Sequence, residues 1–191
     1  ADKVTVYLVL AIVIGARLGH ILFYDNVGLY LKNPWKIFMV WQGGLASHGA
    51  AVAIIVAVIL LARYLKFFHP PLSWIALLDL ISVPTAFAAV CIRLGNFFNQ
   101  EILGCPTEVS WGVIFGHPLE GWPVAVYHPA QVYEALFYFG AFLFLLYLSY
   151  QPRFLLKEGR LIGLFFMLVF VFRFFVEFIK LESSQAVNFA A

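Results

Sequence analysis

Long runs of apolar residues alternate with short polar segments along the chain. The runs cover residues 4–23, 45–65, 74–96, 131–150 and 161–179. Each is close to the ~20 residues that an α-helix needs to cross ~30 Å of hydrocarbon. They are continuously apolar rather than alternating at every second residue, which argues against the strands of a transmembrane barrel. The pattern predicts an all-α, polytopic transmembrane helix bundle with about five spans.

The composition supports an integral membrane protein. Hydrophobic residues make up 63% of the 191 residues, charged residues make up 12%, and the mean hydropathy is +0.93. The net charge of +2 is too small to indicate nucleic-acid binding, and no basic tract with interleaved aromatic residues occurs. We expect membrane lipids or lipid-embedded substrates as partners. Cys91 and Cys105 have no metal-ligand spacing, and we expect both to be structural.

Basic residues orient the predicted spans. Arg63 and Lys66 lie at the end of the second span, and three more basic residues lie at 153–160, between the fourth span and the fifth. Both groups fall on one side, and Lys and Arg concentrate in cytoplasmic loops, so this side is predicted to be the cytoplasm. The loop 99–128 on the opposite side contains three Glu residues and no Lys or Arg. Its glycines, prolines and aromatic residues are typical of an ordered lid at the level of the lipid headgroups.

Polar side chains inside or at the ends of the spans are the main candidates for a functional site. Charged groups in hydrocarbon are costly, about 2.5–3.5 kcal/mol for Arg on insertion scales, so they usually pair or face a wet cavity. The candidates are Arg17, His20, His48, Asp79, Arg93, Asn96, Glu134, Arg173 and Glu177. The densest group is the segment 93–101, RLGNFFNQE, at the end of the third span.

Two arginines suggest an anion site. Arg93 and Arg173 come from different predicted helices and can form a fork-shaped clamp for a phosphate, which a single lysine cannot. Arg173 and Glu177 are four residues apart and share one helix face. They are either an ion pair that only hides charge from lipid or a pair that leaves Arg173 available to a phosphate. Asp79 is interpreted as structural, a partner for an arginine such as Arg17.

Two further segments carry candidate chemistry. His48 lies in the segment 43–49, GGLASHG, whose glycines allow the backbone to approach a ligand closely. A single histidine is more often a satisfied core residue than a catalyst, and both interpretations stay open. The segment 128–134, HPAQVYE, begins the fourth span. Its proline and carboxylate suit a helix N-terminus, but this does not explain why Glu134 is carried into hydrocarbon.

Five segments together resemble the prolipoprotein diacylglyceryl transferase family of bacterial inner membranes. They are residues 15–20 (GARLGH), 41–49 (WQGGLASHG), 93–101 (RLGNFFNQE), 128–134 (HPAQVYE) and 172–177 (FRFFVE). Each segment is weak evidence by itself, but they occur in the family's order over nearly the whole chain. The family transfers the diacylglyceryl group of phosphatidylglycerol to the lipobox cysteine thiol of a preprolipoprotein. The reaction leaves a thioether, releases glycerol 1-phosphate and begins lipoprotein maturation.

The resemblance implies roles for individual residues. Arg93 and Arg173 would hold the phosphate as catalytic groups, and His48 would be the base that takes the thiol proton. The phosphatidylglycerol headgroup site would also include Asn96, Asn99 and Glu101. The supporting residues would be Gly49, Arg17, His128, Gln131, Tyr133, Glu134 and Glu177, with the two glutamates orienting the arginines. We expect both arginines and His48 within one cavity near the outer leaflet, without a metal or a cofactor.

Alternatives stay open at this point. The arginines alone could activate the thiol through their positive charge. Charged groups in spans also mark transport pathways, so a transporter or channel for an anion or a lipid headgroup is the second interpretation. A lipid-binding membrane subunit without catalytic activity is the third.

The resemblance also implies that the chain is truncated. Members of the family have about seven spans, one before the first run found here and one after the last. We expect a single catalytic membrane domain over residues 1–191, truncated at both ends, with residues 99–128 as its periplasmic lid. It would lie as a monomer in the bacterial cytoplasmic (inner) membrane, with its active site near the outer leaflet.

Overall fold

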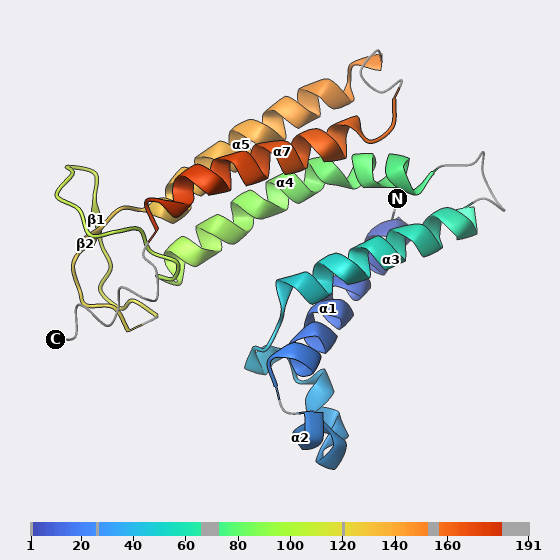
Figure 1. Cartoon of the computed structure of the whole chain (residues 1–191), viewed down its shortest axis with the longest axis horizontal. Helices are drawn as coiled ribbons and strands as arrows, with labels where there is room; N and C mark the ends of the chain where they lie inside the picture. Colours follow the sequence, from blue (N-terminus) through green and yellow to red (C-terminus); the bar gives the residue numbers. More distant parts are fainter. Residues whose placement is uncertain (1, 26, 66–72, 120, 153–156, 181–191) are drawn as a thin grey trace. The chain divides into compact units, whose positions relative to one another are not determined.

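The computed structural model describes residues 2–25, 27–65, 73–119, 121–152 and 157–180 (Figure 1). Its helices are α1 (Asp2–Phe23), α2 (Val27–Lys32), α3 (Ser47–Leu65), α4 (Trp74–Phe98), α5 (Ala130–Ser149) and α7 (Arg160–Glu177). The shorter elements are the 3-10 helices η1 (Pro34–Phe38) and η2 (Val40–Gln42) and the strands β1 (Val113–Ile114) and β2 (Val126–Tyr127). The predicted all-α architecture is confirmed.

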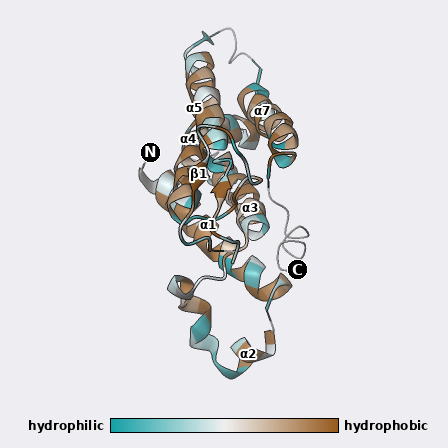
Figure 2. Cartoon of the chain, turned by 90° about the vertical axis from the view of Figure 1, so that its left-hand side faces the viewer, coloured by the Kyte–Doolittle hydropathy of each residue, from teal (hydrophilic) through white to brown (hydrophobic). Residues whose placement is uncertain are grey.

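Four of the described helices are long and apolar enough to cross a membrane. They cover Val4–Phe23, Ser47–Tyr64, Trp74–Phe98 and Ala130–Ser149, which coincide with the first four predicted runs. The chain is therefore a multi-pass membrane protein. Hydrophobic residues dominate the ribbons of α5 and α7 (Figure 2).

The fifth predicted run forms helix α7. This helix has 18 residues, three of which, Arg160, Arg173 and Glu177, are charged. Two groups used to orient the chain, Lys66 and the residues 153–156, lie outside the described residues, as does Glu120 of the predicted lid.

The chain forms two compact units, residues 1–77 and 78–191. In the first unit, α1 and α3 pack through glycines. A Cβ atom on Gly19 of α1 would lie 2.7 Å from the Cα atom of Gly49 on α3, and one on Gly15 would lie 2.6 Å from the Gly49 carbonyl oxygen. Glycines four residues apart allow two membrane helices to touch backbone to backbone. Gly49 is therefore required by helix packing.

In the second unit, α4, α5 and α7 form a three-helix bundle (Figure 1). Two buried clusters hold it together, formed by Ala86, Leu145, Leu161 and Phe165 and by Val90, Ala135 and Tyr138. The rings of Phe137 on α5 and Phe172 on α7 stack with 3.8 Å between their centroids. The end of α4, the start of α5 and the end of α7 therefore meet at one end of the bundle.

The segment 99–128 folds over that end as a small ordered cap. Strands β1 and β2 pair antiparallel, with Val113 opposite Tyr127. A buried cluster of Leu103, Phe115, Trp122 and Tyr127 forms its core. Burial raises the pKa of the Tyr127 hydroxyl, which donates a hydrogen bond to the Pro123 carbonyl at 2.7 Å. The expected ordered, turn-rich segment is present, with a core of its own.

Asp79 is structural, but its partners differ from the predicted arginine. Its carboxylate accepts hydrogen bonds from the N–H groups of Gly159 at 2.7 Å and Ile162 at 2.9 Å, at the start of α7. The first N–H groups of a helix have no partner within the helix, and the positive end of the helix dipole favours a carboxylate. Arg17, the suggested partner, is satisfied by backbone carbonyls in its own unit. Asp79 therefore caps α7.

Replacing Asp79 by alanine should lower the free energy of unfolding by about 2 kcal/mol, because two N–H groups lose their acceptor in apolar surroundings. Asp79→Asn keeps one acceptor oxygen and should lose less. Thermal unfolding of the purified protein in detergent measures both. The control is Thr85→Ala on the same helix, where an exposed hydroxyl bonds only to the Ile81 carbonyl one turn earlier. Equal unfolding midpoints for wild type and Asp79→Ala would contradict the cap.

Candidate functional site

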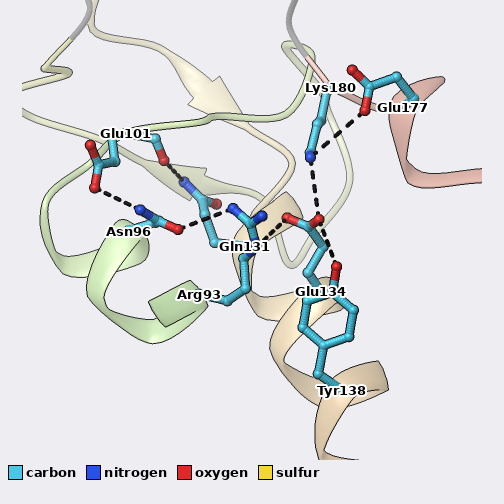
Figure 3. A network of polar contacts seen from close by, with 8 residues as sticks. All are labelled: Arg93, Asn96, Glu101, Gln131, Glu134, Tyr138, Glu177 and Lys180. Carbon is cyan, nitrogen blue, oxygen red and sulfur yellow. Dashed lines mark hydrogen bonds and ion pairs between the residues drawn. The ribbon is translucent and has the colours of Figure 1, made fainter. Parts of the chain in front are cut away.

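A fully buried carboxylate lies at the centre of the polar network in the second unit. Glu134, on the second turn of α5, has a solvent-exposed fraction of 0%. Its Oε2 atom lies 3.2 Å from Nε of Arg93 on α4, in an ion pair that lacks hydrogen-bond alignment (Figure 3). An unpaired carboxylate could not be kept ionised at such a site. The structure thus brings together Arg93 and Glu134, as the resemblance implied.

Arg93 also connects to the polar run that follows it. Its Nη1 atom donates to the Asn96 Oδ1 atom at 3.1 Å, and Asn96 Nδ2 donates to Glu101 Oε1 at 2.7 Å (Figure 3). Asn99 Nδ2 donates to the same Glu101 oxygen at 3.3 Å. Arg93 and Asn96 are three residues apart and share a helix face, while Glu101 returns to them from the turn after α4. The four predicted members of this segment therefore form one hydrogen-bonded chain.

The turn that carries Glu101 has an unusual backbone. Gln100 and Ile102, on either side of Glu101, have φ angles of 55° and 58°. This left-handed region is rare for a branched residue such as Ile and costs of order 1–3 kcal/mol, a strain often found at functional sites. Gln131, fully buried on α5, donates from Nε2 to the Glu101 carbonyl at 2.7 Å. Gln131 therefore acts on the site by fixing this turn.

Arg173 lies on α7 with an exposed side chain. It follows Phe172, whose ring packs against Phe137 and Tyr138 of α5. The Tyr138 hydroxyl in turn lies 3.5 Å from Oε1 of Glu134. The residue before Arg173 therefore packs on the tyrosine that contacts Glu134, the partner of Arg93.

Glu177 has a different partner from the one expected. Its carboxylate lies 3.8 Å from Nζ of Lys180, and no ion pair with Arg173 is found in the part of the chain that the structure describes. Lys180 also reaches Glu134, with Nζ 3.2 Å from Oε1 (Figure 3). Sequence reasoning missed Lys180, although it follows Glu177 by three residues and Arg173 by seven, the spacing of one helix face. Tyr138 was also missed, because the candidates were chosen by charge and a tyrosine carries none.

The start of α5 carries a second group of polar contacts. The Trp111 Nε1–H group donates to the Tyr133 hydroxyl at 2.9 Å, and that hydroxyl lies 3.1 Å from Nδ1 of His128. The Tyr133 oxygen accepts from Trp111, which leaves its hydrogen available to a lone pair on Nδ1. His128 and Tyr133 thus join the 99–128 segment to α5, beside the Arg93 network.

His48 belongs to the first unit and is the second residue of α3. Its ring is exposed and packs against Phe23, with 5.3 Å between ring centroids, and Tyr24, with 5.5 Å. The glycine contact between α1 and α3 brings these rings together, because Gly49 directly follows His48. An exposed imidazole on a rigid helix start can accept a proton from a group that reaches it.

Arg17 organises the segment that leads to His48. It is buried on α1 and donates to the carbonyls of Lys36 at 2.6 Å, Ile37 at 3.0 Å and Gly43 at 2.9 Å. Gly44 has a φ angle of +75°, and a Cβ atom there would lie 2.6 Å from the Arg17 Nη1 atom. Nearby, the Asp25 carboxylate accepts from the Tyr30 hydroxyl at 2.6 Å, which raises the pKa of Tyr30. Arg17 therefore supports the loop through its carbonyls.

Metal ligands do not gather in the described residues. No group of three or more His, Cys, Asp or Glu side chains there has the arrangement of a metal site. The polar groups of the second unit instead offer cationic donors: Arg93, Arg173 and Lys180. Guanidinium groups bind phosphate through two parallel hydrogen bonds. The arrangement suits a phosphate ester at the end of the bundle.

Comparison with known proteins identifies the family. A relative from Protochlamydia amoebophila, named phosphatidylglycerol–prolipoprotein diacylglyceryl transferase, is 41% identical over 94% of this chain and 48% of its own length. Relatives with the same name from Tolumonas auensis and Porphyromonas gingivalis are 41% and 39% identical, each over 94% of this chain. This chain spans 66% and 64% of their lengths, so it matches less than two thirds of each relative. The model of the prolipoprotein diacylglyceryl transferase family matches residues 1–190, and the chain therefore belongs to that family.

Proposed function

We propose that this protein transfers the diacylglyceryl group of phosphatidylglycerol to the lipobox cysteine of a preprolipoprotein. The observation that carries the proposal is Arg93, held by the buried Glu134 at the end of the bundle where Phe172, the neighbour of Arg173, packs on Tyr138. Such a pair of guanidinium groups suits the phosphate of an anionic lipid. The substrates in the relatives' names, phosphatidylglycerol and a prolipoprotein, support the same assignment.

The reaction is a displacement at carbon. The cysteine sulfur attacks the glycerol carbon that carries the phosphate, so a C–S bond forms and the C–O bond to the phosphate breaks. The electron pair of that bond leaves on the phosphate oxygen of glycerol 1-phosphate. Negative charge on the phosphate increases as the bond breaks, so fixed arginines stabilise the transition state more than the bound substrate. The diacylglyceryl group remains on sulfur as a thioether.

In this proposal His48 takes the thiol proton, and Asn96, Asn99 and Glu101 shape the headgroup site beside Arg93. Activation of the thiol by the arginines alone is the competing route. We place the protein in the bacterial inner membrane as a monomer, with the active site near the outer leaflet and residues 99–128 as a periplasmic lid. The absence of Lys and Arg from that segment supports this orientation.

The test adds phosphatidylglycerol vesicles and a lipobox peptide to the purified protein. Mass spectrometry should detect a thioether-linked diacylglyceryl peptide together with an equal amount of glycerol 1-phosphate. Phosphatidylcholine vesicles and a peptide with serine in place of the lipobox cysteine serve as controls. If no thioether forms, the proposal fails. Anion flux through protein-containing liposomes without peptide would instead favour a channel or transporter.

A further inference from the structure

Two cations share the buried carboxylate of Glu134. Arg93 Nε lies 3.2 Å from one oxygen, and Lys180 Nζ lies 3.2 Å from the other (Figure 3). The Lys180 side chain has an exposed fraction of 9%, so this lysine is itself largely removed from solvent. A buried lysine is tolerated only where its charge is compensated. A single arginine would already suffice to neutralise Glu134, so the second cation calls for an explanation.

The balance of charge explains why a second cation is present. Arg93 and Glu134 alone form a neutral pair, and a neutral pair attracts a phosphate weakly. With Lys180 bound to the other oxygen, the three groups carry one net positive charge. Glu177 also approaches Lys180, at 3.8 Å, but its side chain is 54% exposed, so water screens it strongly. Glu177 therefore cancels only part of the charge that Lys180 supplies.

The backbone fixes Lys180 in this position. It pairs with Gly104 in an isolated antiparallel β-bridge, and the Cys105 N–H group donates to the neighbouring Ile179 carbonyl at 2.7 Å. The Cys105 thiol donates to the Lys180 carbonyl at 3.5 Å. Lys180 thus joins the 99–128 segment, the end of α7 and the start of α5. Arg173 lies seven residues earlier, on the helix that this contact holds in place.

We propose that Lys180 is a positioning residue for phosphate binding. Its ammonium group neutralises part of the negative charge of Glu134, so the positive charge of Arg93 stays available to an anionic phosphate ester. This inference rests on the proposed function, and it concerns the phosphate of the lipid donor. Lys180 acts through Glu134 and need not touch the substrate.

Lys180→Met removes the charge while keeping a long apolar side chain. Its KM for phosphatidylglycerol should rise about tenfold or more, because a buried charge pair loses one partner, while kcat changes less. Lys180→Arg keeps the charge and should hold KM within about threefold of wild type, since either cation can pair with a carboxylate. The matched control is Lys157→Met, an exposed lysine before α7 in the same unit, which should leave KM unchanged.

The deciding variant combines Lys180→Met with Glu134→Gln. If Lys180 acts by balancing the carboxylate, removing the negative charge as well should recover affinity, so the double variant should bind phosphatidylglycerol better than Lys180→Met. A purely structural ion pair would show the same non-additivity in the unfolding midpoint while KM stayed unchanged, so both quantities are measured for each variant.

Several results would overturn the inference. They are a wild-type KM in Lys180→Met, a raised KM in Lys180→Arg, and additive losses of affinity for phosphatidylglycerol in the double variant. Each presupposes an active wild-type protein. If the wild type forms no thioether, the proposed function fails first; if it is active and these variants behave otherwise than expected, only the role of Lys180 fails.

Discussion

Replacing Arg93 by lysine should remove most of the transfer activity, with kcat/KM falling roughly 100-fold to 1,000-fold. The charge is retained, but the planar fork is lost. Nε and Nη1 of Arg93 contact Glu134 and Asn96 at 3.2 and 3.1 Å, which fixes the plane of the guanidinium group. A lysine ammonium is a point charge, so it cannot hold Glu134, Asn96 and a phosphate in one fixed geometry.

The measurement is the initial rate of thioether formation at several phosphatidylglycerol concentrations. The matched control is Arg63→Lys, the same change at an exposed arginine on α3, which should keep full activity. An unfolding midpoint close to that of wild type shows that Arg93→Lys folds. Wild-type activity in Arg93→Lys would count against the arginine clamp and would favour simple charge attraction.

Replacing His48 by glutamine should abolish turnover while leaving lipid binding intact. Glutamine keeps a polar side chain of moderate size but cannot accept a proton at neutral pH. General base catalysis contributes about 100-fold to 10,000-fold, so kcat should fall by at least about 100-fold. His48 packs on Phe23 and Tyr24 with an exposed ring, so the substitution should disturb the fold little.

Turnover and binding are measured separately for this variant. Thioether formation gives kcat, and the rise in the unfolding midpoint on adding phosphatidylglycerol reports lipid binding. The control is His117→Gln, an exposed histidine of the 99–128 segment whose backbone N–H, rather than its ring, bonds to Gln100. If turnover survives in His48→Gln, the arginines activate the thiol without a histidine base.

Local patterns were sufficient for the helices and for contacts between neighbouring residues. The continuous apolar runs predicted α1, α3, α4 and α5, because burial in lipid selects apolar residues on every face of a helix. The link from Arg93 to Asn96 follows from their spacing of three residues. The pairing of Arg93 with Glu134 was reached through resemblance, since 41 positions separate them and no periodicity relates them.

The partners of isolated charged residues were harder to predict from the sequence than the helices. The sequence shows that Asp79 and Glu177 need compensation but not which group provides it. Asp79 lies beside the start of α7, 80 residues later, and caps its N–H groups. Glu177 pairs with Lys180, which turns toward α5 after the helix ends. Any nearby cation or N–H group would have satisfied the same requirement.

The sequence by itself determined that this is an α-helical membrane protein with costly polar groups at the ends of its spans. It did so because solvation in lipid acts on each segment separately. Only the tertiary structure decided that α4, α5 and α7 place Arg93 and Lys180 on opposite oxygens of one buried Glu134. That choice depends on which helices are neighbours and on their rotation, and these follow from the packing of residues such as Phe137 and Phe172.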